Sequence, residues 1–73
     1  MKTYLTLYFS SEGDKPSEVT KTLMDMGFEP IYGSYDFVYD WRGNAPVEDV
    51  VKFGDRIKSI LKKHNVFFRM ETV

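Results

Sequence analysis

Cysteine is absent from this chain of 73 residues, and histidine occurs only once. The first absence excludes disulfide bonds and thiolate metal sites. A transition-metal site would then need carboxylates, and the Asp and Glu residues show no recognisable ligand spacing. The single histidine, His64, falls near the expected end of a helix, where a partly charged imidazole is favoured by the helix dipole. We interpret His64 as structural and expect neither a metal nor a cofactor.

The chain also lacks an excess of positive charge and any long apolar run. Ten Lys and Arg residues stand against eleven Asp and Glu residues, which gives a net charge of −1. Phosphate backbones demand a basic surface, so nucleic acid is disfavoured as a partner. No apolar run approaches the roughly 18 residues of a membrane span, and no signal-peptide pattern is present. The sequence predicts no membrane partner, and the cytoplasm is the expected compartment.

The length and composition predict one small folded domain over residues 1–73. The chain is 42% hydrophobic and 16% aromatic, which is too apolar for a disordered segment. In a chain this short, the free energy of apolar burial nearly cancels against the conformational entropy lost on folding. Because no disulfide can add stability, association with a second copy is an expected source of it.

Hydrophobic spacing divides the chain into six elements. Strands are expected over residues 2–9, 28–32, 35–41 and 66–72, and helices over residues 15–26 and 45–63. Pro30 removes one backbone donor from the short second strand, which therefore belongs at a sheet edge. Asp14 and Asn44 are expected to cap the helix N-termini, while Gly27 and Asn65 are expected to end the helices.

This order of elements predicts an α+β fold, the ferredoxin-like β-α-β-β-α-β plait. Right-handed crossovers then place residues 2–9 and 35–41 at the centre of a four-stranded antiparallel sheet. Both helices cover one face of that sheet. The other face, here called the open face, must meet water, a ligand or another chain.

Alternation along each strand predicts which side chains reach the open face. In the first strand, Leu5, Leu7 and Phe9 are expected to face the helices. The third strand is ambiguous because its aromatic residues and its aspartates lie on opposite sides. Burying Asp36 and Asp40 without partners is costly, so we expect the aromatic side to face the helices. That side consists of Tyr35, Phe37, Tyr39 and Trp41.

The open face is then a mixed aromatic and charged surface. Its expected homodimer interface consists of Tyr4, Tyr8, Val38, Phe67 and Arg69. Such a cluster is large enough for self-association, and a merely solvated face or a base-stacking platform are the alternatives. Asp36 and Asp40 share a strand face but lie roughly 13 Å apart, too far to share a proton or one metal. The sequence therefore favours a non-catalytic protein.

Two segments resemble a known family. Residues 33–38 (GSYDFV) and residues 65–73 (NVFFRMETV) are similar to the G-x-Y-D strand start and the closing strand of the effector-binding domains of Lrp/AsnC transcriptional regulators. The resemblance covers residues 33–73 and implies a dimer formed through the sheets, with a small effector such as an amino acid. It also implies that Gly33 lets the ligand approach the backbone, while Tyr35 and Asp36 line the pocket.

Together these inferences predict a small binding or regulatory module. We expect it to self-associate through its sheet and to bind a small polar metabolite. A sheet platform for single-stranded RNA is one alternative. The other is a small metal-dependent nuclease that uses Asp36, for which the sequence supplies no evident second ligand.

Overall fold

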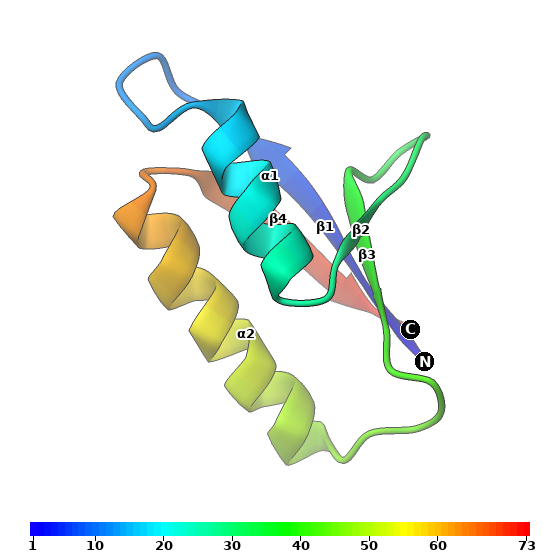
Figure 1. Ribbon diagram of the computed structural model, residues 1–73. Coiled ribbons are helices and arrows are strands. Elements are labelled where there is room, and N and C mark those ends of the chain that lie inside the picture. Colours follow the sequence, from blue (N-terminus) through cyan, green and yellow to red (C-terminus); the bar gives the residue numbers. More distant parts are fainter.

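The computed structural model describes residues 1–73 as one sheet covered by two helices (Figure 1). In chain order the elements are β1 (Lys2–Tyr8), α1 (Pro16–Asp25), β2 (Glu29–Pro30), β3 (Phe37–Asp40), α2 (Val47–Lys63) and β4 (Phe67–Thr72). The four strands form one antiparallel sheet in the order β2-β3-β1-β4. This confirms the predicted ferredoxin-like plait, with β1 and β3 at the centre and β2 at an edge.

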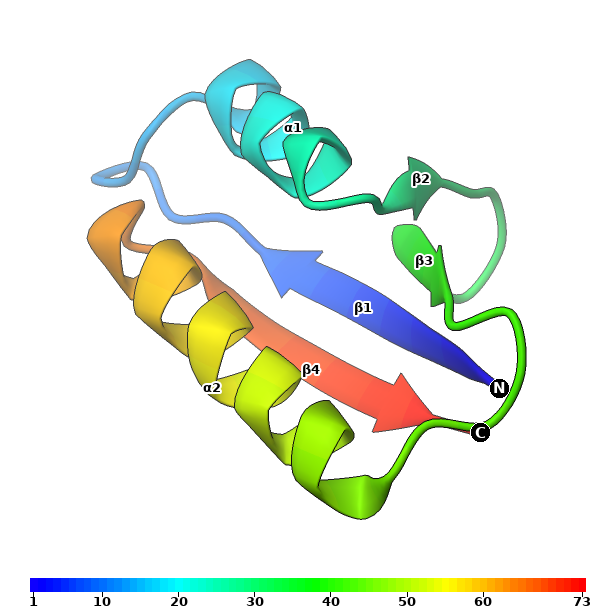
Figure 2. The ribbon, with the colours of Figure 1, turned by 60° about the horizontal axis from the view of Figure 1, so that its bottom comes forward.

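Both helices lie on the same side of the sheet, and no element covers the other side (Figure 2). The core between the two layers consists of Leu5, Leu7, Val19, Leu23, Phe28, Phe37, Ile57, Leu61 and Val66. Phe28 is only 2% exposed, and its ring stacks on Phe53 of α2 with centroids 5.6 Å apart. Neither helix is both long enough and apolar enough to cross a membrane.

Central strand β1 follows the predicted alternation along its whole length. Thr3, Leu5 and Leu7 are buried beneath the helices, whereas Tyr8 is 52% exposed. The expectation that Phe9 continues the inward row is wrong, because the ladder with β4 ends at Tyr8 and Phe9 is 45% exposed. Alternation holds only while a strand is paired, so it fails one residue beyond the last pair.

The third strand is shorter than predicted because its regular pairing with β1 begins only at Phe37, which lies opposite Leu5. Asp36 donates its backbone N–H to the Leu5 carbonyl at 2.8 Å, and its Oδ2 accepts the Leu7 N–H at 2.8 Å. A side-chain carboxylate thus takes the place of a backbone acceptor. Phe37 and Tyr39 face the helices as predicted, but regular alternation begins only at Phe37.

Tyr35 lies on the open face, so its predicted position beneath the helices is wrong. Its ring contacts Tyr4, with centroids 4.9 Å apart, and Tyr4 is an open-face residue of β1. The prediction that Trp41 faces the helices is confirmed. Its Nε1–H donates to the buried Thr3 hydroxyl at 2.8 Å, and its ring packs edge-on against Phe53 of α2 at 5.1 Å.

The helix N-termini differ from the prediction, while the C-termini agree with it. α1 is capped by Lys15 and α2 by Pro46, and neither cap makes a side-chain hydrogen bond. The expected cap at Asp14 is wrong because its carboxylate pairs with another side chain. The expected cap at Asn44 is wrong because α2 begins two residues later than predicted. Gly27 and Asn65 end the helices with φ of 104° and 56°, as expected.

Candidate functional site: the open face of the sheet

The open face gathers side chains from three strands and from the segment before β3. Strand register places Tyr4 beside Val38 and Glu71, Tyr8 beside Phe67, and Thr6 beside Arg69. Residues paired directly across strands share a face. We define the open-face patch as Tyr4, Tyr8, Tyr35, Val38, Phe67, Arg69 and Glu71. All five predicted interface residues belong to it, although their role in an interface stays a prediction.

One end of the open-face patch is apolar and exposed. Tyr8 and Phe67 lie directly opposite each other on β1 and β4, and they are 52% and 74% exposed. Adjacent exposed aromatic rings present a contiguous apolar surface, unlike single apolar residues scattered over a protein. This end of the patch is therefore available to another surface without any rearrangement of the fold.

The other end is polar and is ordered by a chain of contacts. The Tyr35 hydroxyl donates to Glu71 Oε2, and Arg69 Nη2 donates to Glu71 Oε1 at 2.7 Å. The hydrogen bond from Tyr35, followed by the bond from Arg69, lowers the pKa of Glu71. The same bond to Glu71 raises the pKa of Tyr35 above its ordinary value of 10.0. The alternation of residues 66–72 predicts Glu71 on the open face together with Phe67 and Arg69. Its bond to Tyr35 was not predicted, because Tyr35 was assigned to the opposite face.

Stability is expected to depend on pH through this pair of residues. The lowered Glu71 pKa adds stability above its ordinary value of 4.5, and this stability is lost as the pH falls through the folded-state pKa. The raised Tyr35 pKa adds stability below 10.0, and this is lost as the pH rises through the folded-state value. Urea unfolding at a series of pH values should show a weaker dependence at acid pH in Glu71→Gln. An acid limb identical to that of the parent chain would contradict the assignment, and Glu12→Gln in the first loop is the control.

The turn before β3 holds the three residues that the family resemblance assigned to a ligand. Gly33 has a φ of 104°, and a Cβ at this position would meet no atom within 4 Å. The glycine thus serves the turn itself. Tyr35 is engaged with Tyr4 and Glu71, and the Asp36 carboxylate already accepts the Leu7 N–H. Binding of a small polar metabolite at this turn stays a prediction, which a thermal-shift screen of amino acids tests.

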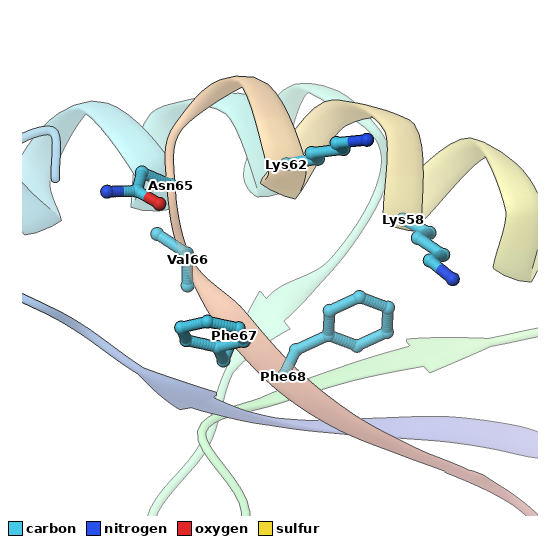
Figure 3. Close-up of a pocket in the computed structure, with 6 residues that line it drawn as sticks. All are labelled: Lys58, Lys62, Asn65, Val66, Phe67 and Phe68. Atoms are coloured by element: carbon cyan, nitrogen blue, oxygen red, sulfur yellow. The ribbon is translucent and has the colours of Figure 1, made fainter.

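Two hollows lie on the surface, both beside α2 and away from that turn. The larger is a groove of about 500 Å³ between α2 and the start of β4 (Figure 3). It is lined by Lys58, Lys62, Asn65, Val66, Phe67 and Phe68. The smaller is a shallow hollow of about 290 Å³ over Trp41 and Phe53. Sequence reasoning missed the groove, whose one signal was a pair of lysines four residues apart beside the apolar stripe of α2.

The single histidine joins the start of α1 to the end of α2. His64 Nδ1 lies 2.7 Å from Asp14 Oδ2, and its Nε2 lies 3.5 Å from the Thr22 hydroxyl. This order of groups is that of a hydrolase triad. However, the Thr22 hydroxyl donates to the Glu18 carbonyl at 3.0 Å, so its proton is directed away from the imidazole. These contacts connect the end of α2 to α1 and to the residues before it, in agreement with the structural interpretation of His64.

No group of three or more His, Asp or Glu side chains is arranged to hold a metal ion. Comparison with family models, curated proteins and solved structures found no significant match for the chain. The similarity to Lrp/AsnC effector-binding domains therefore stays a resemblance carried by residues 33–38 and 65–73.

Proposed function

We propose that the chain is a non-catalytic binding module that self-associates through the open face of its sheet. The observation that carries this proposal is the exposed pair of Tyr8 and Phe67, next to an ordered polar cluster on the same face. Protein interfaces combine an apolar centre with a polar rim, and they are enriched in aromatic residues and Arg. The open-face patch has this composition.

Self-association would also bury apolar surface in addition to that of the small core. The nine buried apolar residues come from one side of the sheet only. A second copy placed against the open face would remove both exposed aromatic rings from water, at roughly 25 cal/mol for each Å² of apolar surface buried. It would do so without disturbing the helices, since both lie on the opposite side (Figure 2).

The charges of the open face favour a protein partner over single-stranded RNA. Its cations are Lys2 and Arg69, and Arg69 is already paired with Glu71. Register places Asp40 opposite Lys2 and Glu29 beside Val38, so acidic groups outnumber basic ones on this face. A phosphate backbone would meet net repulsion there.

Tyr8→Lys tests the proposal directly. An ammonium group in place of the exposed ring would be desolvated in the interface and would remove the apolar contact of Tyr8, so self-association should weaken at least about tenfold, equal to about 1.4 kcal/mol. Sedimentation equilibrium over a concentration series measures this change. The fold should be unaffected, because Tyr8 is half-exposed at the end of β1.

Met24→Lys is the matched control, since Met24 is 50% exposed on α1, away from the open face. It should leave self-association unchanged. Equal weakening by both substitutions, or no weakening by Tyr8→Lys, would count against an interface at the open face.

A further inference from the structure

Strand β4 forms a free edge of the sheet along its whole length. The order β2-β3-β1-β4 gives β4 a neighbour on one side only. At the opposite edge, β2 has two residues and includes Pro30, so little backbone is available for pairing there. β4 has six residues, no proline and two aromatic side chains. Edge strands of this kind invite pairing with another strand unless something blocks them.

Hydrogen bonding at the sheet end identifies which β4 groups are free. The backbone groups of Lys2 and Val73 exchange two bonds, of 2.8 and 2.9 Å. In an antiparallel ladder, bonded residues alternate with residues whose N–H and C=O point away from the partner strand. Counting back from Val73, the outward groups belong to Phe68, Met70 and Thr72. Three N–H donors and three carbonyl acceptors thus point away from the sheet at this edge.

Apolar residues are exposed at both ends of this edge and on the helix above it. Phe67, the first residue of β4, is 74% exposed, and Val73, which follows its last residue, is 77% exposed. On α2, Val47 and Val51 are 78% and 56% exposed. These valines share a helix face with Lys58 and Lys62, because successive positions in the series 47, 51, 58 and 62 are four, seven and four residues apart. That face is directed to the β4 side, because both lysines line the groove over the start of β4 (Figure 3).

The charges of β4 are complementary to a second copy of β4 in one antiparallel register. A two-fold axis at Met70 would place Arg69 of each copy opposite Glu71 of the other copy, which gives two pairs of opposite charge. It would also pair the outward groups of Phe68 with those of Thr72. An axis at position 69 would oppose two arginines, and an axis at position 71 would oppose two glutamates, both of which are unfavourable.

The same register brings the exposed apolar ends together. Phe67 would lie opposite Val73 of the second copy, and the backbone ladder would join the two sheets into one of eight strands. α2 runs antiparallel to β4 (Figure 2). Gly54 of α2 lies against the Met70 side chain of β4. Two α2 helices would therefore lie side by side in opposite directions.

Antiparallel α2 helices are also complementary in charge. The first turn of α2 carries Glu48 and Asp49, and its last turn carries Lys62 and Lys63. In the two-fold arrangement, the acidic turn of one helix approaches the basic turn of the other. The helix dipoles are opposed as well, which is the favourable orientation.

We propose that β4 pairs edge-to-edge with β4 of a second copy of this chain, in the antiparallel register centred on Met70. The occupant of this edge is a second copy because the charges of β4, its exposed apolar ends and the ends of α2 all match themselves under one two-fold axis. This contact is distinct from the open-face interface proposed above and does not depend on it. If both form, they build an assembly larger than a dimer.

Charge substitution tests the register. Arg69→Glu and Glu71→Arg each place like charges opposite one another at both positions, so each variant alone should lose edge pairing at least about tenfold. An equimolar mixture should regain it, because every cross-strand pair then has opposite signs. Sedimentation of the separate variants and of the mixture provides the measurement, with circular dichroism to confirm that each variant folds. Every chain in this test also carries Tyr8→Lys, because Arg69 and Glu71 belong to the open-face patch as well. A mixture no more associated than its components overturns the register.

Amide hydrogen exchange tests the edge itself in the unmodified chain and in Tyr8→Lys. The N–H groups of Phe68, Met70 and Thr72 should exchange at least about tenfold more slowly at high than at low concentration, since they gain acceptors only in the pair. Tyr8→Lys should retain this protection even where open-face association is lost. The experiment therefore distinguishes loss of the edge contact from loss of the open-face interface. Free exchange of these three amides at millimolar concentration would overturn the proposal and leave the edge to a foreign strand.

Discussion

Phe28→Ala is expected to remove a large part of the free energy of unfolding. The ring is 2% exposed and lies 5.6 Å from both Phe53 and Tyr39, so its deletion leaves a cavity between the helices and the sheet. Loss of a buried phenyl group costs about 3–5 kcal/mol. A chain of this length has a total stability of roughly 4–11 kcal/mol. Urea unfolding followed by circular dichroism measures the change.

Phe67→Ala makes the same chemical change at a ring that is 74% exposed. In dilute solution, where association does not contribute, it should alter stability by no more than about 0.5 kcal/mol. Equal losses in the two variants would mean that the core does not lie between the helices and the sheet. A small change in Phe67→Ala would mean that Phe67 contributes little to the fold and is free for the two proposed contacts.

Asp36→Ala is expected to cost about 1.5–3 kcal/mol, because a charged acceptor is removed from the Leu7 N–H. The bond measures 2.8 Å and lies at the point where the β3 ladder begins. Asp36→Asn keeps an acceptor oxygen and should recover part of this loss. Asp55→Ala removes an exposed carboxylate from α2 and is the control for charge alone.

The outcome for Asp36 also bears on function. If Asp36→Ala is no more destabilising than Asp55→Ala, the carboxylate does not support the sheet. It would then be free for the ligand or metal roles that the sequence suggested. A clear difference between the two variants assigns it instead to the backbone of β1.

The fold could be predicted from the sequence because its main signals are local. Alternation in residues 2–8 and helical spacing in residues 47–63 identify the elements, and Gly27 and Asn65 mark helix ends through their positive φ. The handedness of the crossovers then leaves one sheet order, which places Pro30 at an edge. None of these inferences requires a contact between residues far apart in the chain.

Two of the errors share a physical cause, which is a carboxylate whose hydrogen-bond partner lies far away in the chain. Alternation assigned Tyr35 to the helix side, but the Asp36 carboxylate replaces a ladder acceptor and turns the preceding residue to the open face. Asp14 has the residue type of an N-cap, yet its carboxylate pairs with His64 from the other helix. Sequence spacing contains no record of such long-range partners.

The candidate site was predictable in its members but not in its connections. The alternation of β1 and β4 correctly grouped Tyr4, Tyr8 and Phe67 on one face. The bond between Tyr35 and Glu71 and the groove beside Lys58 depend on the relative placement of three elements. Spacing along the sequence does not specify that placement.

Sedimentation equilibrium of the unmodified chain at neutral pH is the most direct test of the central claim, that the uncovered surfaces of this sheet serve self-association. The claim predicts that the average mass rises with concentration, from that of one chain to at least that of two, within the high micromolar range. A mass that stays at one chain throughout that range would contradict it.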